Sequence, residues 1–203
     1  DSFIKFLSPK EKQARLRGEA FVSKELKGLK LEFDLDINNN AEVEVVVNQE
    51  TNSSMKGRGA GTILIRINTL GKFQMWGDFQ VYEGTYDFKY GSLIQKDILV
   101  VPGGNISWDG VPERARLDIS AKYVTQANPA ILLDNPSVNR KIPVEVVVDL
   151  KGEISQPDIS FNINFPGVSS TVRSELEYKL QSESQRQKQA LFLIASNTFI
   201  NED

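Results

Sequence analysis

The sequence of 203 residues contains no cysteine and no histidine. Without cysteine the chain has no disulfide, no thiol nucleophile and no thiolate metal ligand, an absence that fits the cytoplasm and the periplasm equally well. Without histidine it has no Ser-His-Asp triad, no His-ligated zinc and no imidazole general base. We therefore expect a protein without metal or cofactor, and we do not expect an enzyme.

Long hydrophobic runs and a basic excess are missing as well. No stretch of 18 apolar residues is present, so no membrane-spanning helix is predicted. The formal net charge is -3, which argues against nucleic acid as the main partner. The chain starts at Asp1 without a charged-then-apolar leader, so we interpret it as an internal fragment or a processed product.

Residues 1–28 have no clear periodicity. Ser8, Pro9 and Glu11 are typical of a helix start, with a cap, a proline in the first turn and an acid three residues after the cap. We expect an N-terminal arm or a short helix here, and an ordered loop on a sheet edge is the alternative.

From Leu29 onward apolar and polar residues alternate, which predicts strands with one buried face. The runs Leu29–Ile37 and Ala41–Val47 flank the turn signal Asn38-Asn39-Asn40, so we expect them to form a hairpin. A run broken near Glu83-Gly84 and several shorter ones follow, about nine or more strands in all. The further runs are 55–67, 73–81, 86–90, 98–101, 106–108, 117–123, 144–150 and 159–165.

The last residues change to a helical period. Val172, Leu176 and Leu180 recur at helical spacing, residues 181–189 hold no apolar side chain, and 190–194 are apolar again. This predicts a helix or a helix pair. We therefore divide the chain into an arm (1–28), a β-rich domain (29–167) and a helical C-terminal tail (168–203).

Three features that could carry chemistry are weak. Gly57-Arg58-Gly59-Ala60-Gly61 precedes a strand and lacks a following Lys-Ser/Thr, so it is not a phosphate loop. Its glycines instead permit a close backbone approach or a curled sheet. The basic residues Lys56, Arg58 and Arg66 are more typical of a solvated face than of an anion site. The acids lie on the polar phase of their strands, where a catalytic carboxyl would not be desolvated; they are Asp34, Asp36, Glu42, Glu44, Asp78 and Asp118.

The apolar face is the remaining feature, and alternation alone leaves two interpretations open. It is either the closed core of a sandwich or barrel, or an open groove for acyl chains. Each Å² of apolar surface buried contributes about 25 cal/mol, so a lipid tail in such a groove would bind without specific contacts.

An ordered set of short segments then carries a family resemblance. No single segment is specific, but their order along about two thirds of the chain is. The segments are Gly59-x-Gly61, Gly71-Lys72-Phe73-Gln74-Met75-Trp76-Gly77, Val81-Tyr82-Glu83-Gly84-Thr85-Tyr86-Asp87-Phe88, Gly104-Asn105-Ile106-Ser107-Trp108-Asp109-Gly110 with Pro112, Ala115-x-Leu117-Asp118-Ile119-x-Ala121-x-Tyr123, Val144 to Gly152, and Gln156-Pro157-Asp158-Ile159. In this order they resemble the C-terminal domain of the translocation and assembly module B (TamB) family of diderm bacterial envelopes.

The resemblance implies an elongated, curled antiparallel sheet that forms an apolar, β-taco-like trough. It also implies a periplasmic protein associated with both membranes, which moves phospholipid between them. The family's C-terminal domain is expected to meet an outer-membrane barrel protein of the TamA/BamA type.

We therefore predict a lipid-groove lining and, on the tail, a set of partner-docking residues. The lining comprises Ile63, Ile65, Ile67, Phe73, Met75, Phe79, Tyr86, Phe88, Leu117, Ile119, Val144, Val146, Val148, Phe161 and Ile163. The docking set comprises Val172, Leu176, Leu180, Leu191 and Ile194.

A scaffold or chaperone for outer-membrane protein assembly is the alternative function. In that case an open sheet edge would template a partner strand, and main-chain hydrogen bonds would supply the affinity. A closed sandwich without a ligand is also compatible with the alternation.

Overall fold

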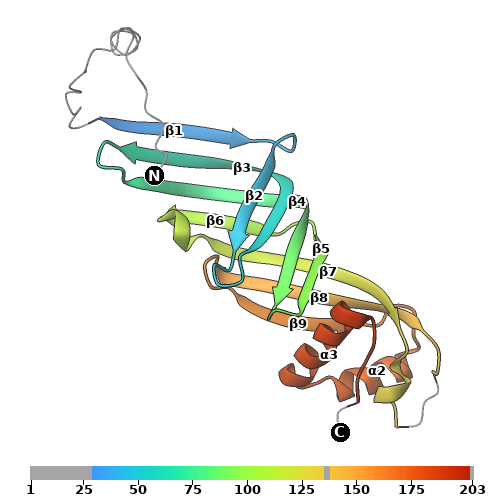
Figure 1. The fold of residues 1–203 in the computed structure, drawn as a ribbon. Coiled ribbons are helices and arrows are strands. Elements are labelled where there is room, and N and C mark those ends of the chain that lie inside the picture. Colours follow the sequence, from blue (N-terminus) through green and yellow to red (C-terminus); the bar gives the residue numbers. More distant parts are fainter. Residues whose placement is uncertain (1–28, 135–137, 202–203) are drawn as a thin grey trace, which may run out of the picture.

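The computed structural model describes residues 29–134 and 138–201 (Figure 1). The arm predicted for residues 1–28, with its helix start at Ser8, lies outside the described residues. Within them the chain forms nine strands, two short 3-10 helices and two α-helices. The elements in order are β1 (Lys30–Ile37), β2 (Glu42–Val47), β3 (Ser53–Asn68), β4 (Phe73–Tyr90), β5 (Ile94–Val100), β6 (Asn105–Gly110), η1 (Pro112–Arg114), β7 (Arg116–Ala127), η2 (Pro129–Leu132), β8 (Ile142–Glu153), β9 (Asp158–Asn164), α2 (Ser170–Lys179) and α3 (Glu183–Ser196).

All nine strands belong to one antiparallel sheet, which confirms the β-rich class with a helical C-terminal part. The main path through the sheet is β1-β3-β4-β5-β7-β8-β9. Strand β2 pairs with β3 beyond the end of β1, and β6 lies between β4 and β7 beyond the end of β5. β3 and β4 each run the length of two shorter strands, so the sheet has two halves that share long central strands.

The strand register places most of the apolar residues of the strands on one face, which we call the inner face. Phe33 lies opposite Ile65, and Ile65 lies opposite Met75. At the other end of the sheet, Ile119 lies opposite Leu150, which lies opposite Ile159. Because directly opposed residues share a face, the clean alternation in the sequence produces one continuous apolar surface.

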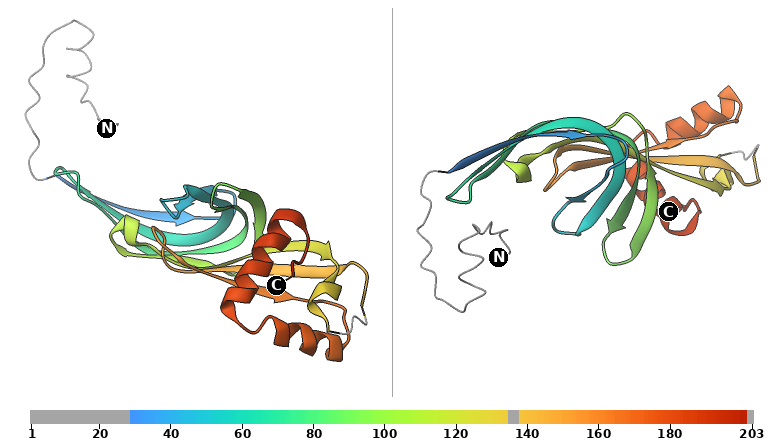
Figure 2. Two further views of the ribbon diagram at one scale, coloured as in Figure 1. Left: turned by 60° about the horizontal axis from the view of Figure 1, so that its bottom comes forward. Right: turned by 90° about the horizontal axis from the view of Figure 1, so that it is seen from above.

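Glycines allow the sheet to curl between its two halves. A Cβ atom on Gly59 would lie 2.0 Å from the carbonyl oxygen of Gln80, and one on Gly77 would lie 2.1 Å from that of Thr62. The β3–β4 register shifts between Arg58 and Gly59, which is the signature of a β-bulge. Strands β3 and β4 bend here, and the sheet curves around its inner face (Figure 2).

Two strand predictions are wrong in detail. The runs 29–37 and 41–47 do not pair with each other; both lie antiparallel to β3. β3 has 16 residues, enough to pair with the 8 of β1 and the 6 of β2 end to end, so the asparagine turn redirects the chain along one edge. The run predicted to break near Glu83-Gly84 is the single strand β4. Because Gly84 has no side chain, the strand bends there and continues without a break.

The half of the molecule near the helices has a closed core. The Phe88 ring on β4 meets the Phe161 ring on β9 edge to face, with centroids 6.1 Å apart. These strands are not neighbours in the sheet, so the contact crosses the inside of the curl. The backbone N–H of Asn48, just after β2, donates to the carbonyl of Ile154, just after β8, at 2.9 Å. This hydrogen bond joins the ends of two further strands across the closed core.

The tail forms two helices, so the helix pair is confirmed over the single helix. Ser169 and Ser182 cap α2 and α3, and their hydroxyl oxygens accept from the backbone N–H groups of Val172 and Gln185. The α3 helix packs on β9 and β5 and covers the closed half (Figure 1).

Candidate functional site

The inner face is open to solvent at the end formed by β1. Among residues 29–134 and 138–201, no second layer of structure covers the side chains there, and they form what we call the open strip. Phe33 and Phe73 keep 50% and 42% of their surface exposed, values that are high for large apolar side chains. The open strip comprises Leu31, Phe33, Leu35, Ile65, Ile67, Phe73 and Met75.

The predicted lining residues divide between the open strip and the closed core. Ile65, Ile67, Phe73 and Met75 are partly or largely exposed. The other predicted residues are buried in the core, where they hold the curled sheet together. These are Ile63, Phe79, Tyr86, Phe88, Leu117, Ile119, Val144, Val146, Val148, Phe161 and Ile163. Their role as a lipid lining stays a prediction.

Three residues of the open strip were not among the predicted lining. Leu31, Phe33 and Leu35 on β1 join it because they lie opposite Ile67, Ile65 and Ile63 on β3. The alternation from Leu29 to Ile37 indicates that these side chains share an apolar face. The expected hairpin with residues 41–47, however, does not place that face beside β3. Only the true partner, β3, shows that they extend the same surface.

The predicted docking residues of the tail face inward. Val172, Leu176, Leu180 and Ile194 are buried against the protein itself, and Leu191 is partly buried against the same core. Their spacing therefore accounts for how α2 and α3 attach to the sheet. A role in partner docking stays a prediction.

Polar contacts fix α3 in place. Asn197, in the left-handed conformation with φ of 59°, ends the helix. Its side-chain oxygen accepts from the Tyr123 hydroxyl at 2.6 Å and from the Thr125 hydroxyl at 2.7 Å, both on β7. The buried Gln189 side chain donates to the carbonyl of Ile200 at 2.8 Å and accepts from its N–H at 3.0 Å. The sequence contained no signal for either pair.

Tyr86 is the inner-face residue with a strongly shifted ionisation. Burial raises the pKa of Tyr86 to about 12, although a hydrogen bond with Ser53 acts in the opposite direction. The phenol is therefore neutral at any physiological pH and packs as part of the apolar core.

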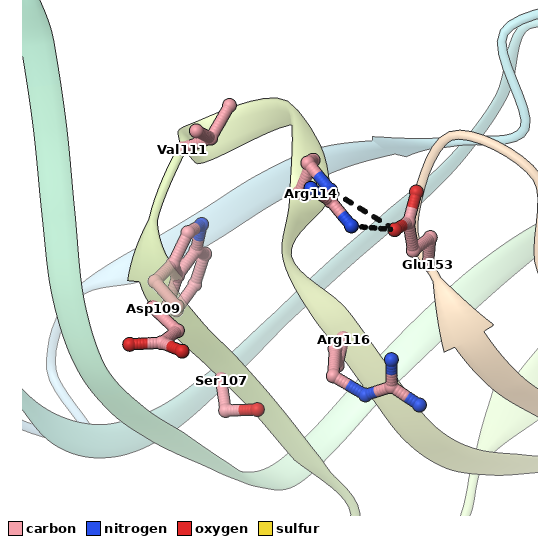
Figure 3. Close-up of a pocket in the computed structure, with 7 residues that line it drawn as sticks. Ser107, Asp109, Val111, Arg114, Arg116 and Glu153 are labelled. Atoms are coloured by element: carbon pink, nitrogen blue, oxygen red, sulfur yellow. Dashed lines mark hydrogen bonds and ion pairs between the residues drawn. The ribbon is translucent and has the colours of Figure 1, made fainter.

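The outer face of the sheet is polar. A shallow cavity of about 280 Å³ lies beside η1, where Arg114 and Glu153 form an ion pair at 3.1 Å and Arg116 and Asp109 point outward (Figure 3). In the described parts of the chain, no cluster of three or more acidic side chains has the spacing of a metal site. The acids tested as catalytic candidates are all exposed; Asp36 accepts from Thr62, and Asp78 accepts from Asn105.

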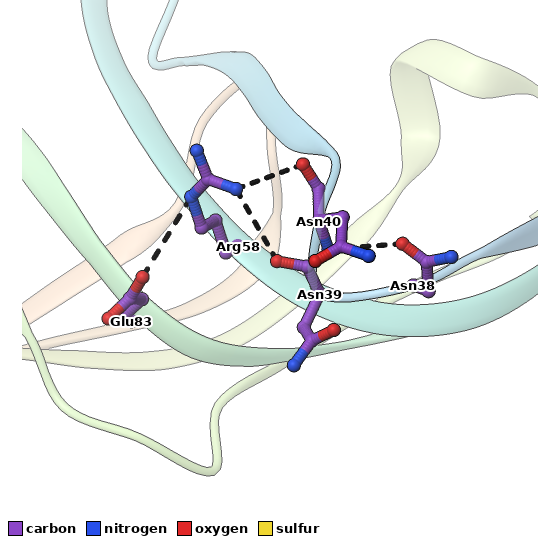
Figure 4. A network of polar contacts seen from close by, with 5 residues as sticks. All are labelled: Asn38, Asn39, Asn40, Arg58 and Glu83. Carbon is purple, nitrogen blue, oxygen red and sulfur yellow. Dashed lines mark hydrogen bonds and ion pairs between the residues drawn. The ribbon is translucent and has the colours of Figure 1, made fainter.

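The basic residues beside the glycines are paired on the outer face. Arg58 donates to the carbonyl of Asn40 at 2.9 Å and lies 3.9 Å from the Glu83 carboxylate, so it fastens the β1–β2 connection to β4 (Figure 4). Arg66 pairs with Glu32 at 2.7 Å. These contacts agree with the solvated-face interpretation and leave no anion pocket among these residues.

Across residues 29–134 and 138–201, no helix combines the length and the apolar character needed to cross a membrane.

The fold and its exposed surface define a class of protein: a curled antiparallel β-sheet module that presents hydrocarbon side chains on one face. The family model of the TamB C-terminal domain matches residues 1–202, and the chain belongs to this family. No curated protein matches the sequence.

Membership fixes the broad role. The TamB family is an envelope-associated translocation and assembly module and is not a known enzyme family. The chain thus takes part in TamB-type function, and its family associates with the outer-membrane assembly machinery.

Proposed function

We propose that this chain is the C-terminal end-piece of a periplasmic lipid conduit that carries phospholipid toward the outer membrane. The open strip is the observation that carries this proposal. It is apolar on three adjacent strands, β1, β3 and β4, and it continues without interruption into the closed core. Acyl chains on it would gain about 25 cal/mol for each Å² of apolar surface removed from water.

The strip has the chemistry of a general acyl-chain surface. Phe33, Ile65 and Met75 offer aliphatic and aromatic contacts without a hydrogen-bonding group among them. The charged residues of the same strands, such as Glu32 and Arg66, lie on the outer face and pair with each other there. Such a surface binds hydrocarbon and does not discriminate between lipid head groups.

The closed half gives the conduit an end. Because α3 and the Phe88–Phe161 contact fill the inside of the curl, the inner face cannot stay open beyond the middle of the sheet. We propose that this closed end, with the helices, docks an outer-membrane barrel protein of the TamA/BamA type.

Lipid co-purification tests the conduit. The chain would be purified from a diderm host, and bound lipid would be measured by native mass spectrometry and extraction. We expect phospholipid with the natural chain and a loss of most of it in Ile65→Asp, which places a carboxylate on the open strip. Leu99→Asp is the matched control, since Leu99 is 69% exposed on the outer face and lies opposite Lys122. A lipid-free natural chain, or equal lipid in both variants, contradicts the conduit.

A scaffold for outer-membrane protein assembly is the second candidate. Strand β1 favours it, because β1 ends the sheet path and pairs only with β3 among the described residues. Such an edge can template a partner strand. If Ile65→Asp loses lipid and function but still binds the barrel partner, the conduit is favoured; if it loses lipid and keeps function, the scaffold is favoured.

A further inference from the structure

A second exposed apolar surface lies at the opposite end of the molecule from the open strip. The β4–β5 hairpin turn, residues 90–94, and the outward side of α3 enclose a cavity of about 490 Å³. Leu191, Phe192 and Ala195 are its α3 residues. We call this surface the tip patch. Figure 1 shows the helices far from β1, and Figure 2 shows the hairpin beside α3.

The side chains of the tip patch are unusually exposed. Leu93 is 94% exposed, and Tyr90 and Phe192 are each 43% exposed. The Gln187 side chain donates to the Tyr90 hydroxyl at 3.1 Å and holds α3 against the hairpin. The patch is therefore a fixed combination of two elements, whereas an isolated exposed leucine is ordinary.

The charges around the tip patch have one sign on its own side. Lys96 shares the inner face of the hairpin with Tyr90 and Ile94, and Lys188 lies one helical turn before Leu191 and Phe192. Asp87, Lys89 and Asp97 lie on the opposite face of the hairpin, where Lys89 pairs with Asp87 at 3.1 Å. From residue 187 to 201, Lys188 is the single charged residue. The chain as a whole carries -3, so this cationic border is a local feature.

We propose that the tip patch inserts into the surface of a phospholipid bilayer that contains anionic lipid. Tyr and Phe side chains favour the boundary between head groups and acyl chains, and a protruding leucine reaches the hydrocarbon below it. Lys188 then lies at the level of the lipid phosphates, and Lys96, whose ammonium lies 5.4 Å from the centroid of the Tyr123 ring, adds positive charge behind it. This contact requires neither lipid on the open strip nor a protein partner, so it goes beyond the proposed function.

Vesicle flotation tests the insertion. The 203-residue chain would be mixed with vesicles of phosphatidylethanolamine and phosphatidylglycerol, and with vesicles of phosphatidylcholine alone. We expect flotation with the anionic vesicles, weaker flotation with the neutral ones, and a loss of at least about tenfold in bound fraction for Leu93→Asp combined with Phe192→Asp.

Leu70→Asp is the matched control. Leu70 is 92% exposed at the β3–β4 hairpin turn, and the cavity beside this turn is lined mainly by polar side chains such as Lys30, Arg66 and Lys72. We expect it to float like the natural chain. No flotation of the natural chain, or equal loss in the Leu70 and Leu93 variants, overturns the proposal; a partner protein that binds the patch of a chain that does not float also overturns it.

Tryptophan placed at each turn gives a second measurement. We expect Leu93→Trp to shift its emission to the blue on vesicle addition and to be quenched by lipids with brominated acyl chains, while Leu70→Trp does neither. Ile65→Asp should still float, which separates this result from the lipid co-purification test. Flotation that is lost in Ile65→Asp and kept in the Leu93 variant would place the lipid contact at the open strip and overturn the tip patch.

Discussion

At the scale of single residues, the glycines of β3 and β4 decide how closely the two strands approach. A Cβ atom on Gly61 would lie 2.0 Å from the carbonyl oxygen of Asp78 and 2.9 Å from the Cα of Phe79. Both obstructing atoms belong to the backbone and cannot rotate away. The close approach of β3 and β4 in the curled sheet therefore requires glycine at this position.

We expect Gly61→Ala to lower the free energy of unfolding by roughly 2–3 kcal/mol, because the strands must separate to admit the methyl group. Gly71→Ala is the control. Gly71 has φ of +78° but no atom within 4 Å of an added Cβ, so only the backbone conformation costs energy, about 1 kcal/mol. Urea unfolding measures both variants, and equal losses would contradict the role of close approach.

Tyr86 predicts a stability loss at high pH. Its pKa rises from 10.0 to about 12 on folding, so the unfolded chain ionises first. The stabilisation is complete below pH 10 and is lost as the pH rises from 10 toward 12, by about 3 kcal/mol in all. In Tyr86→Phe, the total loss of unfolding free energy across this pH window should be smaller by that amount, so stability should fall less steeply with pH. An unchanged slope, measured by urea unfolding at each pH, would show that Tyr86 is not the group responsible.

At the scale of elements, both apolar burial and polar contacts attach α3 to the sheet. The helix buries Ala190, Leu193 and Ile194, and Asn197 then joins its end to β7. The left-handed conformation at Asn197 suits asparagine or glycine, and other side chains are strained there.

We expect Asn197→Ala to cost about 2 kcal/mol, from the strained backbone and the two lost hydrogen bonds. Asn197→Gly keeps the backbone conformation and loses only the hydrogen bonds, so it should cost about 1 kcal/mol. Hydrogen exchange of the α3 amides is the measurement, with faster exchange expected in the alanine variant. If the glycine variant is as unstable as the alanine variant, the backbone conformation contributes nothing.

At the scale of the whole molecule, one face of one sheet serves two purposes. Near the helices it is a packed core, and near β1 it is open. Both parts are apolar and follow the same alternation, so the main difference between them is whether another segment packs above them.

This difference predicts opposite outcomes for one type of substitution. Val146 is fully buried, so Val146→Asp places an unpaired carboxyl in the core and should leave the chain unfolded. Ile65 is partly exposed, so Ile65→Asp should cost about 1 kcal/mol and leave the fold intact. Circular dichroism and urea unfolding of both proteins decide the matter. Unfolding of Ile65→Asp would mean that the open strip is part of the core.

The sequence by itself determined most of the strands, the helical character of the C-terminal part and the apolar face, and it left a single helix and a helix pair both open. Period-two alternation predicts a strand with one solvent-exposed polar face and one buried apolar face. Residues such as Ile119 and Val146 are therefore predicted to lie on the inner face from the sequence alone. The absence of histidine and cysteine, and the acids on the polar phase, likewise pointed away from catalysis. The ordered motifs from Gly59 to Tyr123 were enough to indicate the family, because they depend on local turns and register.

Tertiary structure alone decided the pairing of β1 and the line between core and open strip. Alternation shows which face of a strand is buried but not which strand lies beside it. A long strand such as β3 has room for two partner strands along one edge. Burial of Val146 and exposure of Phe33 depend on whether a distant segment, here α3 or the bend of β4, folds over that place. The tip patch has the same origin, since Leu93 and Phe192 are far apart in the chain and meet only because α3 packs beside the hairpin.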